Sequence, residues 1–348
     1  MKEAKANPRD NYLVIVPEQF TMQTQRQLVD LSENKAIMNI DVLSFKRLAY
    51  RVFDELGITN LTVLEETGKN LVLRKLAAQE ADKLGVIGRN LNRIGYISEV
   101  KSLLSELVQY NISPEELGRY IASGRLSDTL SDKLKDVLVL YEAFEKFMQD
   151  KYITAEEILN VLCNVAEESA ILRNSVIAFD EFTGFTPIQN QLIKKLFVIS
   201  KKIYVTLTID CREDIFKSRG MQELFDMPKR TVKSLTEMAA FYGIEVEEPI
   251  ILDKNYRLAE NEELSFMEQQ LFRKQRRSFE KAPKHIHIDC LRDPKQELTK
   301  IARTINELVR NENLRYRDIA IVTGDVNIYA GYVREIFDKY NIPYFIDA

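Results

Sequence analysis

Apolar residues along this chain follow two different periods, and the change of period divides the chain. Near the N-terminus, the short continuous apolar run at 12–16 predicts a buried strand, because strands covered on both faces are apolar throughout, and residues 40–44 predict a second strand. A helix-like segment follows each run, at 18–31 and at 45–56. This alternation predicts an α/β domain with a mostly parallel sheet.

Between about residues 62 and 170 the spacing becomes helical, as in Leu71, Leu73 and Leu76. Ser113 followed by Pro and two Glu residues is a good helix start, with a cap, proline at the first position and acids in the first turn. This stretch predicts an all-helical insertion. Strand patterns return at 175–179 and 202–207, and we expect them in the same sheet as the first two.

The C-terminal part shows three more strand-like runs. Residues 284–290 alternate between apolar and polar, which predicts a half-buried strand, and 318–323 and 343–346 predict two further strands. A helix is expected at 295–310. A dense basic run around Phe279, within 273–284, is either a phosphate-gripping segment or a solvated linker.

The amino-acid composition narrows the class of protein. The chain has 348 residues, of which 45% are apolar and 29% charged, with a net charge of −4. Cys163, Cys211 and Cys290 are far apart and outside any CxxC pair, which predicts reduced thiols. No apolar run approaches the roughly 20 residues of a membrane span, and the polar N-terminus lacks a signal-peptide core. We therefore expect a cytoplasmic protein without a membrane partner.

The chemically most suggestive residues are Asp180 and Glu181, at the end of the apolar run 176–179. Sites in open α/β sheets lie at the carboxyl ends of strands. A carboxylate pair there can serve the Mg²⁺ ion and the attacking water of a nucleotide. The alternative is a solvated Asp-Glu step that opens a loop.

Several motifs in their order resemble a family. The chain resembles superfamily 1 helicases of the UvrD type, and within them the B subunits of AddAB (RexAB) helicase–nucleases. The residues that carry the resemblance are 12–21 (YLVIVPEQFT), 41–52 (DVLSFKRLAYRV), 179–189 (FDEFTGFTPIQ), 317–323 (RDIAIVT) and 341–346 (NIPYFI).

The resemblance implies a layout of helicase domains. Residues 1–62 and 170–283 would form the first RecA-like domain, and 63–169 its helical insertion. Residues 284–348 would begin a second RecA-like domain.

The resemblance also implies site residues. Asp180 and Glu181 match the Walker B carboxylates that hold Mg²⁺ and activate water, and Gln19 and Arg257 match nucleotide contacts. The segment that contacts single-stranded DNA in relatives matches Ser44, Phe45, Lys46, Arg47 and Arg51.

Other motifs of this helicase family are missing from the sequence. There is no Gly-x-x-x-x-Gly-Lys-[Ser/Thr] phosphate loop, since Gly68-Lys69 is followed by Asn70 and lies in a helix-like segment. We expect the chain to start just after that loop and to be a fragment. An iron–sulfur cluster is expected only in a C-terminal nuclease region outside the chain. The coupling Gln residues that follow two strands in active motors are also lacking, which puts Asp180 and Glu181 in doubt as catalysts.

These observations lead to one favoured function. The chain is expected to be part of an ATP-dependent helicase–exodeoxyribonuclease that acts in recombinational repair. Within that enzyme it would bind DNA and scan it for Chi, without acting as a motor. By itself it is expected to be inactive. Its expected partners are single-stranded DNA, duplex ends and an A-type subunit, with ATP and Mg²⁺ used by the parent complex. The alternatives are a true superfamily 1 motor cut after its phosphate loop, and an α/β interaction scaffold.

Overall fold

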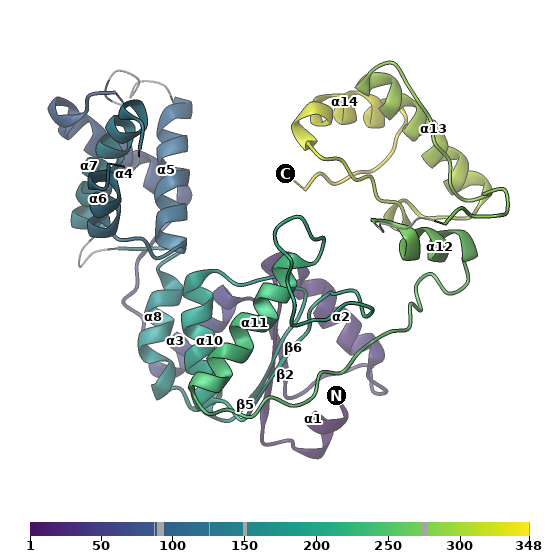
Figure 1. Ribbon diagram of the computed structural model, residues 1–348, viewed down its shortest axis with the longest axis horizontal. Helices are drawn as coiled ribbons and strands as arrows, with labels where there is room; N and C mark the ends of the chain where they lie inside the picture. Colours follow the sequence, from purple (N-terminus) through teal and green to yellow (C-terminus); the bar gives the residue numbers. More distant parts are fainter. Residues whose placement is uncertain (87, 89–93, 125, 149–151, 273–276, 348) are drawn as a thin grey trace. The chain divides into compact units, whose positions relative to one another are not determined.

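The computed structural model describes residues 1–86, 88, 94–124, 126–148, 152–272 and 277–347. Two compact units, Met1–Asp253 and Lys254–Ala348, divide the chain (Figure 1). The elements of the first unit are α1 Lys2–Ala6, β1 Asn11–Ile15, η1 Glu18–Phe20, α2 Thr21–Leu31, β2 Ile40–Leu43, α3 Phe45–Leu56, β3 Val63–Leu64, α4 Glu66–Gln79, η2 Ala81–Lys83, α5 Ile94–Gln109, α6 Pro114–Ala122, α7 Asp128–Met148, β4 Ile153–Thr154, α8 Ile158–Val165, η4 Ala166–Glu168, α9 Ala170–Arg173, β5 Ser175–Phe179, α10 Pro187–Ile199, β6 Lys202–Val205 and α11 Asp226–Phe241.

The main sheet has four strands in the order β2-β1-β5-β6, and every neighbouring pair is parallel. The prediction of one parallel sheet from the four apolar runs is confirmed, and with it the α/β class. The crossovers from β1 to β2 and from β5 to β6 are made by α2 and α10, as parallel neighbours require. Parallel strands in register bring all four carboxyl ends to one edge.

Both faces of the sheet are covered, which explains the apolar runs of the two central strands, β1 and β5. On one face Leu13, Ile15, Ile177 and Phe179, each at most 1% exposed, pack with residues of α3, α8, α10 and α11. The alternate residues of β1 and β5 form a smaller cluster with α1 and α2 on the other face. Period-two alternation places neighbouring residues on opposite faces.

Helix α3 shows how the sequence positions a functional segment. Ser44 caps it by accepting from the Arg47 N–H at 3.3 Å, and Gly57 ends it with a φ of 69°. One helix face buries Leu48, Ala49, Val52 and Phe53 against the sheet. Burial of each large side chain is worth roughly 1.5–3 kcal/mol, against about 1 kcal/mol for a cap. Packing therefore holds α3, and the cap fixes where it begins.

A separate apolar cluster unites α4, α5, α6 and α7. The only strand pairing found within the described part of 63–169 is the two-residue β3–β4 ladder, so the predicted helical character is confirmed. Gly68 and Lys69 lie in α4, and the Lys69 side chain is only 3% exposed and paired with Glu156 at 2.6 Å. These residues are part of a helix and do not form a phosphate loop.

Helix α8 packs with the sheet rather than with the other helices of the block. Ile158, Leu162 and Cys163 join the apolar cluster that covers the sheet. Burial raises the pKa of the Cys163 thiol to about 11, so this thiol is kept protonated. The expected domain boundary at residue 169 stays a prediction, with α8 at the transition.

The second unit is built around two packed helices. Its elements are α12 Glu262–Gln270, α13 Pro294–Asn311, η5 Tyr316–Asp318 and α14 Val326–Lys339. The predicted helix at 295–310 is confirmed by α13. Leu298 and Ala302 of α13 pack with Ile336 and Phe337 of α14.

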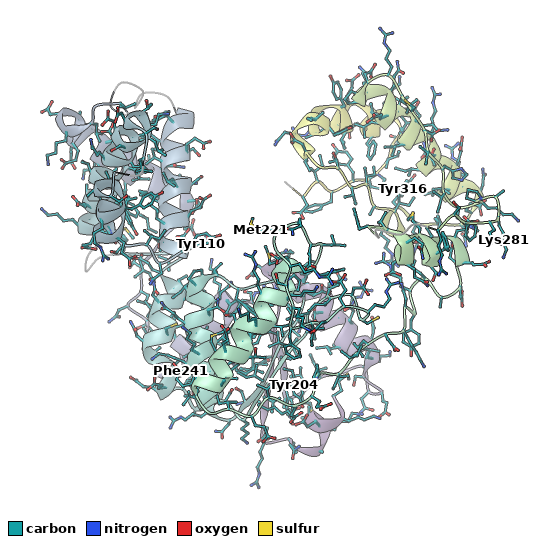
Figure 2. All side chains as sticks on the ribbon, in the orientation of Figure 1. Tyr110, Tyr204, Met221, Phe241, Lys281 and Tyr316 are labelled. Atoms are coloured by element: carbon teal, nitrogen blue, oxygen red, sulfur yellow. The ribbon has the colours of Figure 1, made fainter. Side chains whose placement is uncertain are left out.

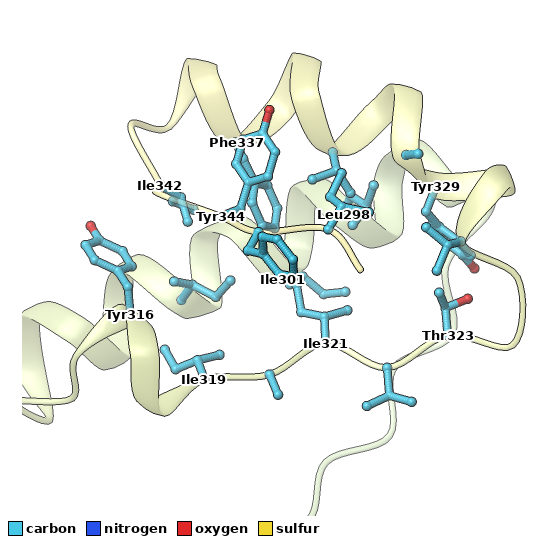
Figure 3. Close-up of a pocket in the computed structure, with 18 of the residues that line it drawn as sticks. Leu298, Ile301, Tyr316, Ile319, Ile321, Thr323, Tyr329, Phe337, Ile342 and Tyr344 are labelled. Atoms are coloured by element: carbon cyan, nitrogen blue, oxygen red, sulfur yellow. The ribbon is translucent and has the colours of Figure 1, made fainter. Parts of the chain in front are cut away.

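The three strands predicted at 284–290, 318–323 and 343–346 are wrong for the described residues, which form no strand there. The last two segments instead run as irregular chain beside α13 and α14 and border an apolar groove of about 830 Å³ (Figure 3). Ile288 and Val322 are both 93% exposed. A strand needs hydrogen-bonded neighbours as well as an apolar sequence, and no strand of the described second unit supplies them.

Candidate nucleotide and nucleic-acid site at the carboxyl edge of the sheet

Polar residues follow each strand of the main sheet at the edge where the strands end. Glu18 comes shortly after β1, Ser44 directly after β2, Asp180 after β5 and Thr206 after β6. The registers set the last residues of neighbouring strands opposite one another. Residues separated by up to 188 positions in the chain, from Glu18 to Thr206, are therefore brought to one edge.

Asp180 is fixed at this edge by three hydrogen bonds. Its backbone N–H donates to the carbonyl of Ile15 at 3.0 Å. Its Oδ1 accepts from the Glu181 N–H at 3.1 Å and from the Thr206 hydroxyl. Three segments thus define where the half-buried carboxylate of Asp180 lies. The second carboxylate oxygen, Oδ2, is in none of these contacts.

Glu181 has a different environment from its neighbour. Its backbone φ of 64° lies in the left-handed region, which costs a residue with a Cβ of order 1 kcal/mol. Its side chain is exposed. This left-handed residue comes directly after Asp180, at the end of β5. The structure brings both residues to the edge, and of the two only Asp180 is held by other segments in the described part of the chain.

Four aromatic rings support this part of the edge. Phe45 stacks on Phe179 with ring centroids 5.8 Å apart, and meets Phe182 and Phe185 edge-on at 5.5 and 6.4 Å. Phe45 itself is only 7% exposed. The residue expected to contact DNA is therefore a core residue in this structure, and it anchors the start of α3 beneath the polar edge.

Glu18 connects β1 to the start of α3. One of its carboxylate oxygens accepts from the Ser44 hydroxyl, and the other accepts from the Arg47 Nε at 3.1 Å. Both Arg47 and Glu18 keep about half of their side-chain surface exposed, at 48% and 56%. The pair is therefore an exposed ion pair, worth little in stability, that orients Arg47 along the edge.

The other cations expected on α3 are also at the surface. Lys46 is exposed, and Arg51 lies 3.8 Å from Asp41 with 56% of its side chain exposed. Together with Arg47 these residues form the α3 basic face, defined as Lys46, Arg47 and Arg51. Its three charges are accessible to a polyanion, although two of them have acidic neighbours.

The two residues expected to contact nucleotide are in different units. Gln19 is exposed in η1, one residue after Glu18 at the edge. Arg257 is exposed in the second unit, where Asn255 accepts from the Leu258 N–H at 3.2 Å and holds the turn around it. Their role as nucleotide contacts stays a prediction.

Glu18 and Thr206 are the two edge residues that the sequence pattern alone did not single out. Both follow an apolar strand run closely, as Asp180 does, and the same strand-end rule would have found them. The acidic pair stands out in the sequence because two adjacent carboxylates are a stronger chemical signal than one Glu or one Thr.

The described part of the edge supplies few of the contacts that a nucleotide needs. A triphosphate is bound by backbone N–H groups of a glycine-rich turn and a nearby cation, and the turn that follows β1, with Pro17, Glu18 and Gln19, contains no glycine. Glu18, Asp180 and Glu181 are acidic, and the neighbouring cation Arg47 is already paired with Glu18. No group of three or more potential metal ligands is present among the residues that the structure describes. The described residues of this edge therefore do not by themselves form a site for a magnesium nucleotide.

The fold and the edge define a class: an α/β protein with a parallel sheet covered on both faces, a large helical insertion, and polar residues gathered at the carboxyl ends of the strands. The sequence comparisons identify the family within that class. The family described as ADDB, N-terminal matches residues 1–268, and the chain belongs to it.

Curated relatives are named as the B subunit of an ATP-dependent helicase/deoxyribonuclease. The relative from Lachnoclostridium phytofermentans is 38% identical over 345 residues, which cover 98% of this chain and 30% of the relative. Those from Clostridium tetani and Clostridioides difficile are 32% and 33% identical, each over 99% of this chain and 30% of their own length. The chain thus spans about 30% of the length of these relatives.

No helix in the described part of the chain has the length and apolar character to cross a membrane.

Proposed function

We propose that this chain is the helicase-like, DNA-contacting part of the B subunit of an ATP-dependent helicase/deoxyribonuclease, acting in double-strand break repair by homologous recombination. The relatives' shared name and their 29–38% identity across nearly the whole chain support the assignment. On this proposal the assembled enzyme is a hydrolase that works in the cytoplasm with an A-type partner subunit. The chain alone is inactive.

The observation that carries the DNA-binding role is the α3 basic face beside the carboxyl edge. Lys46, Arg47 and Arg51 are exposed on one helix whose opposite side is packed on the sheet. A rigid base of this kind holds the cations in a fixed arrangement, which lowers the entropy lost on binding a phosphate backbone. Single-stranded DNA running along this edge is the ligand we propose, with Chi scanning as its purpose.

The edge also supports a non-motor role. Asp180 and Glu181 lie at the end of β5, as a helicase fold requires, but only Asp180 is fixed by neighbouring segments. The turn that follows β1 at this edge, with Pro17, Glu18 and Gln19, contains no glycine. We propose that ATP turnover belongs to the partner subunit and that this edge senses DNA.

Fluorescence anisotropy with labelled single-stranded DNA tests the proposal. If the three cations neutralise three phosphates of single-stranded DNA, a plot of log affinity against log salt concentration should have a slope of about −2. The affinity should then fall roughly 20-fold between about 50 and 200 mM salt. The double substitution Lys46→Ala/Arg47→Ala should flatten that slope by about 1.4. Its melting temperature should stay nearly unchanged, because exposed charges contribute little to stability.

A matched control removes two cations from another part of the same unit. Lys2 and Lys5 are exposed on α1, which packs on the other face of the sheet. Lys2→Ala/Lys5→Ala should leave the salt slope as it is. Equal loss of affinity in both double variants would contradict the α3 basic face and leave only a diffuse charge effect.

A further inference from the structure

The β3–β4 ladder lies between two apolar cores. We call the cluster that covers the main sheet the sheet core, and the cluster of α4 to α7 the insertion core; among the described residues they have no member in common. Val63 and Ile153 of the ladder pack against the sheet core, whereas Leu64 and Tyr152 pack against the insertion core. A Cβ on Gly68 of α4 would come within 2.7 Å of Leu64 Cδ1, so α4 lies close against the ladder. Neighbouring residues of the ladder thus serve different cores, as alternation along a strand requires.

Glu156 lies in the turn between β4 and α8, and its side chain reaches the insertion. Its two carboxylate oxygens accept from Lys69 Nζ of α4 at 2.9 and 2.6 Å. It also borders a small cavity together with Leu73 and Leu104 of the insertion core. Two residues further along the chain, Ile158 is 1% exposed in the sheet core. Three consecutive residues therefore connect the two cores.

The turn that carries Glu156 is fixed by hydrogen bonds of its own. The Glu157 carboxylate accepts from the Thr154 backbone N–H at 2.6 Å, and the Thr154 hydroxyl accepts from the Glu157 backbone N–H at 3.2 Å. This reciprocal pair has the pattern of a capping box and precedes the first residue of α8. A turn held in this way limits the directions in which Glu156 can point.

The insertion supplies a network of charges that receives this carboxylate. Lys69 is 3% exposed and is paired with Glu66 at 2.9 Å as well as with Glu156. Glu66 is paired in turn with Lys101 of α5 at 2.5 Å. The carboxylate of Glu156 is therefore held by two helices of the insertion acting through one network. Lys69 keeps an acidic partner when Glu156 is removed.

We infer that Glu156 is a releasable coupling between the helical insertion and the sheet domain, with the β3–β4 ladder as the hinge beneath it. While the carboxylate lies with Lys69, the two bodies move as one. When it leaves, the insertion turns on the ladder, because two strands of two residues resist bending weakly. An apolar pair would stabilise the fold at least as well, whereas a charged pair fixes one geometry and can be released. The coupling is a conformational device of the chain and stands whether or not the chain binds DNA.

Distances between spin labels test the coupling. Tyr120 of α6 is 53% exposed, and Phe241 at the end of α11, labelled in Figure 2, is 82% exposed. Labels at Tyr120→Cys and Phe241→Cys report the spread of distances between the insertion and the sheet domain. The background carries Cys211→Ser and Cys290→Ser, because both of these thiols are exposed. Glu156→Ala should widen the spread at least about twofold, as expected when a hinge is freed.

Two controls separate a freed hinge from a loosened fold. Glu167→Ala removes an acidic residue that pairs with Lys195 at 3.0 Å within the sheet domain, and it should leave the spread unchanged. Labels at Leu31→Cys and Phe241→Cys both lie in the sheet domain, and their spread should stay the same in Glu156→Ala. An equally wide spread between the two bodies before and after Glu156→Ala would overturn the coupling.

Hydrogen exchange supplies a second measurement with a milder variant. Glu156→Gln keeps the shape of the side chain and removes its charge. The amide of Ile153, which donates to the Thr62 carbonyl at 3.0 Å, should lose at least about tenfold in protection. The amides of α3 and α7 serve as references for the two bodies and should not change. Unchanged protection of Ile153 would overturn the coupling, and so would an equal loss in α3 and α7, since the whole fold would then be weakened. Both measurements are made without DNA, so their failure is separable from failure of the proposed function.

Discussion

The two units of this chain carry the same sequence pattern with opposite results. In the first unit, apolar runs followed by helices become β1, β2, β5 and β6 of a parallel sheet. In the second, the runs at 284–290, 318–323 and 343–346 form no strand, and the last two lie beside α13 and α14. Phe179 of the first unit is 0% exposed, and Val322 of the second is 93% exposed. An apolar run predicts a segment able to form a strand, and its neighbours decide whether it does.

The largest expected difference between the units is in the cost of removing a strand side chain. Phe179→Ala deletes a fully buried ring that contacts Phe45, Phe182 and Phe185. We expect a loss of about 4 kcal/mol in the free energy of unfolding, as for large-to-small changes in cores. Urea denaturation followed by circular dichroism measures it.

The matched change in the second unit is Val322→Ala. Since Val322 is 93% exposed, its truncation should change stability by less than about 0.5 kcal/mol. A loss above about 2 kcal/mol for Val322→Ala would show that the run 318–323 is buried in a sheet in solution, and the contrast between the units would disappear.

A second contrast concerns ion pairs. Lys69 of the first unit is 3% exposed and bonds Glu156, which is 11% exposed, at 2.6 Å. Lys69→Met leaves the buried carboxylate without its partner and should cost about 3 kcal/mol. Lys135, paired with Asp132 at the surface of α7, is the control, and Lys135→Ala should cost less than about 1 kcal/mol. Lys69→Met/Glu156→Leu should recover most of the loss, because it removes both buried charges.

The pH dependence sharpens this prediction. Burial acts to raise the pKa of Glu156, but the hydrogen bonds and charge of Lys69 outweigh it and lower the pKa below 4.5. A lowered pKa gives stability that is present above pH 4.5 and is lost as pH falls through the folded value. In Lys69→Met the burial remains without the charge and hydrogen bonds of Lys69, so the carboxyl protonates more readily. The stability gap between the two proteins should therefore narrow below about pH 4, and a constant gap would contradict the pairing.

Much of the first unit follows from its sequence. Strand patterns in the sequence predicted all four strands of the main sheet, and the helix predicted at 45–56 is α3. The site was predictable where it depends on strand ends, as for Asp180 and Glu181. Phe45 could not be assigned correctly from the sequence, because an aromatic residue at a helix start suits a stacking surface and a core equally well. Only packing against Phe179 distinguishes them.

Interactions between segments that are far apart in the chain could not be predicted from the sequence. Glu18 joining Ser44 and Arg47 spans 26 and 29 positions, and Thr206 joining Asp180 spans 26. These contacts exist because the sheet order places β1 between β2 and β5 and β6 beside β5. Strand order does not follow from hydrophobic period, so neither do the contacts. The strand predictions for the second unit failed for the same reason. The sequence shows the apolar runs, but it does not show whether a neighbouring strand is present to pair with them.

The smallest expected effect concerns an exposed pair in the second unit. Asp318 accepts from Arg315 Nε and from the Arg315 backbone N–H, at 2.8 and 3.0 Å. The side-chain hydrogen bond from Arg315 is the main cause that lowers the pKa of Asp318 to about 2. Because this folded value is depressed, the pair contributes stability above pH 3.8 that is lost as pH falls toward 2. Arg315→Ala should return the pKa of Asp318 toward 3.8 in an NMR titration, while the unfolding midpoint at neutral pH barely moves, since exposed pairs contribute little. A large shift of that midpoint would mean that the pair is buried in solution, as Lys69 and Glu156 are. The second unit would then be more completely packed than the exposed run 318–323 indicates.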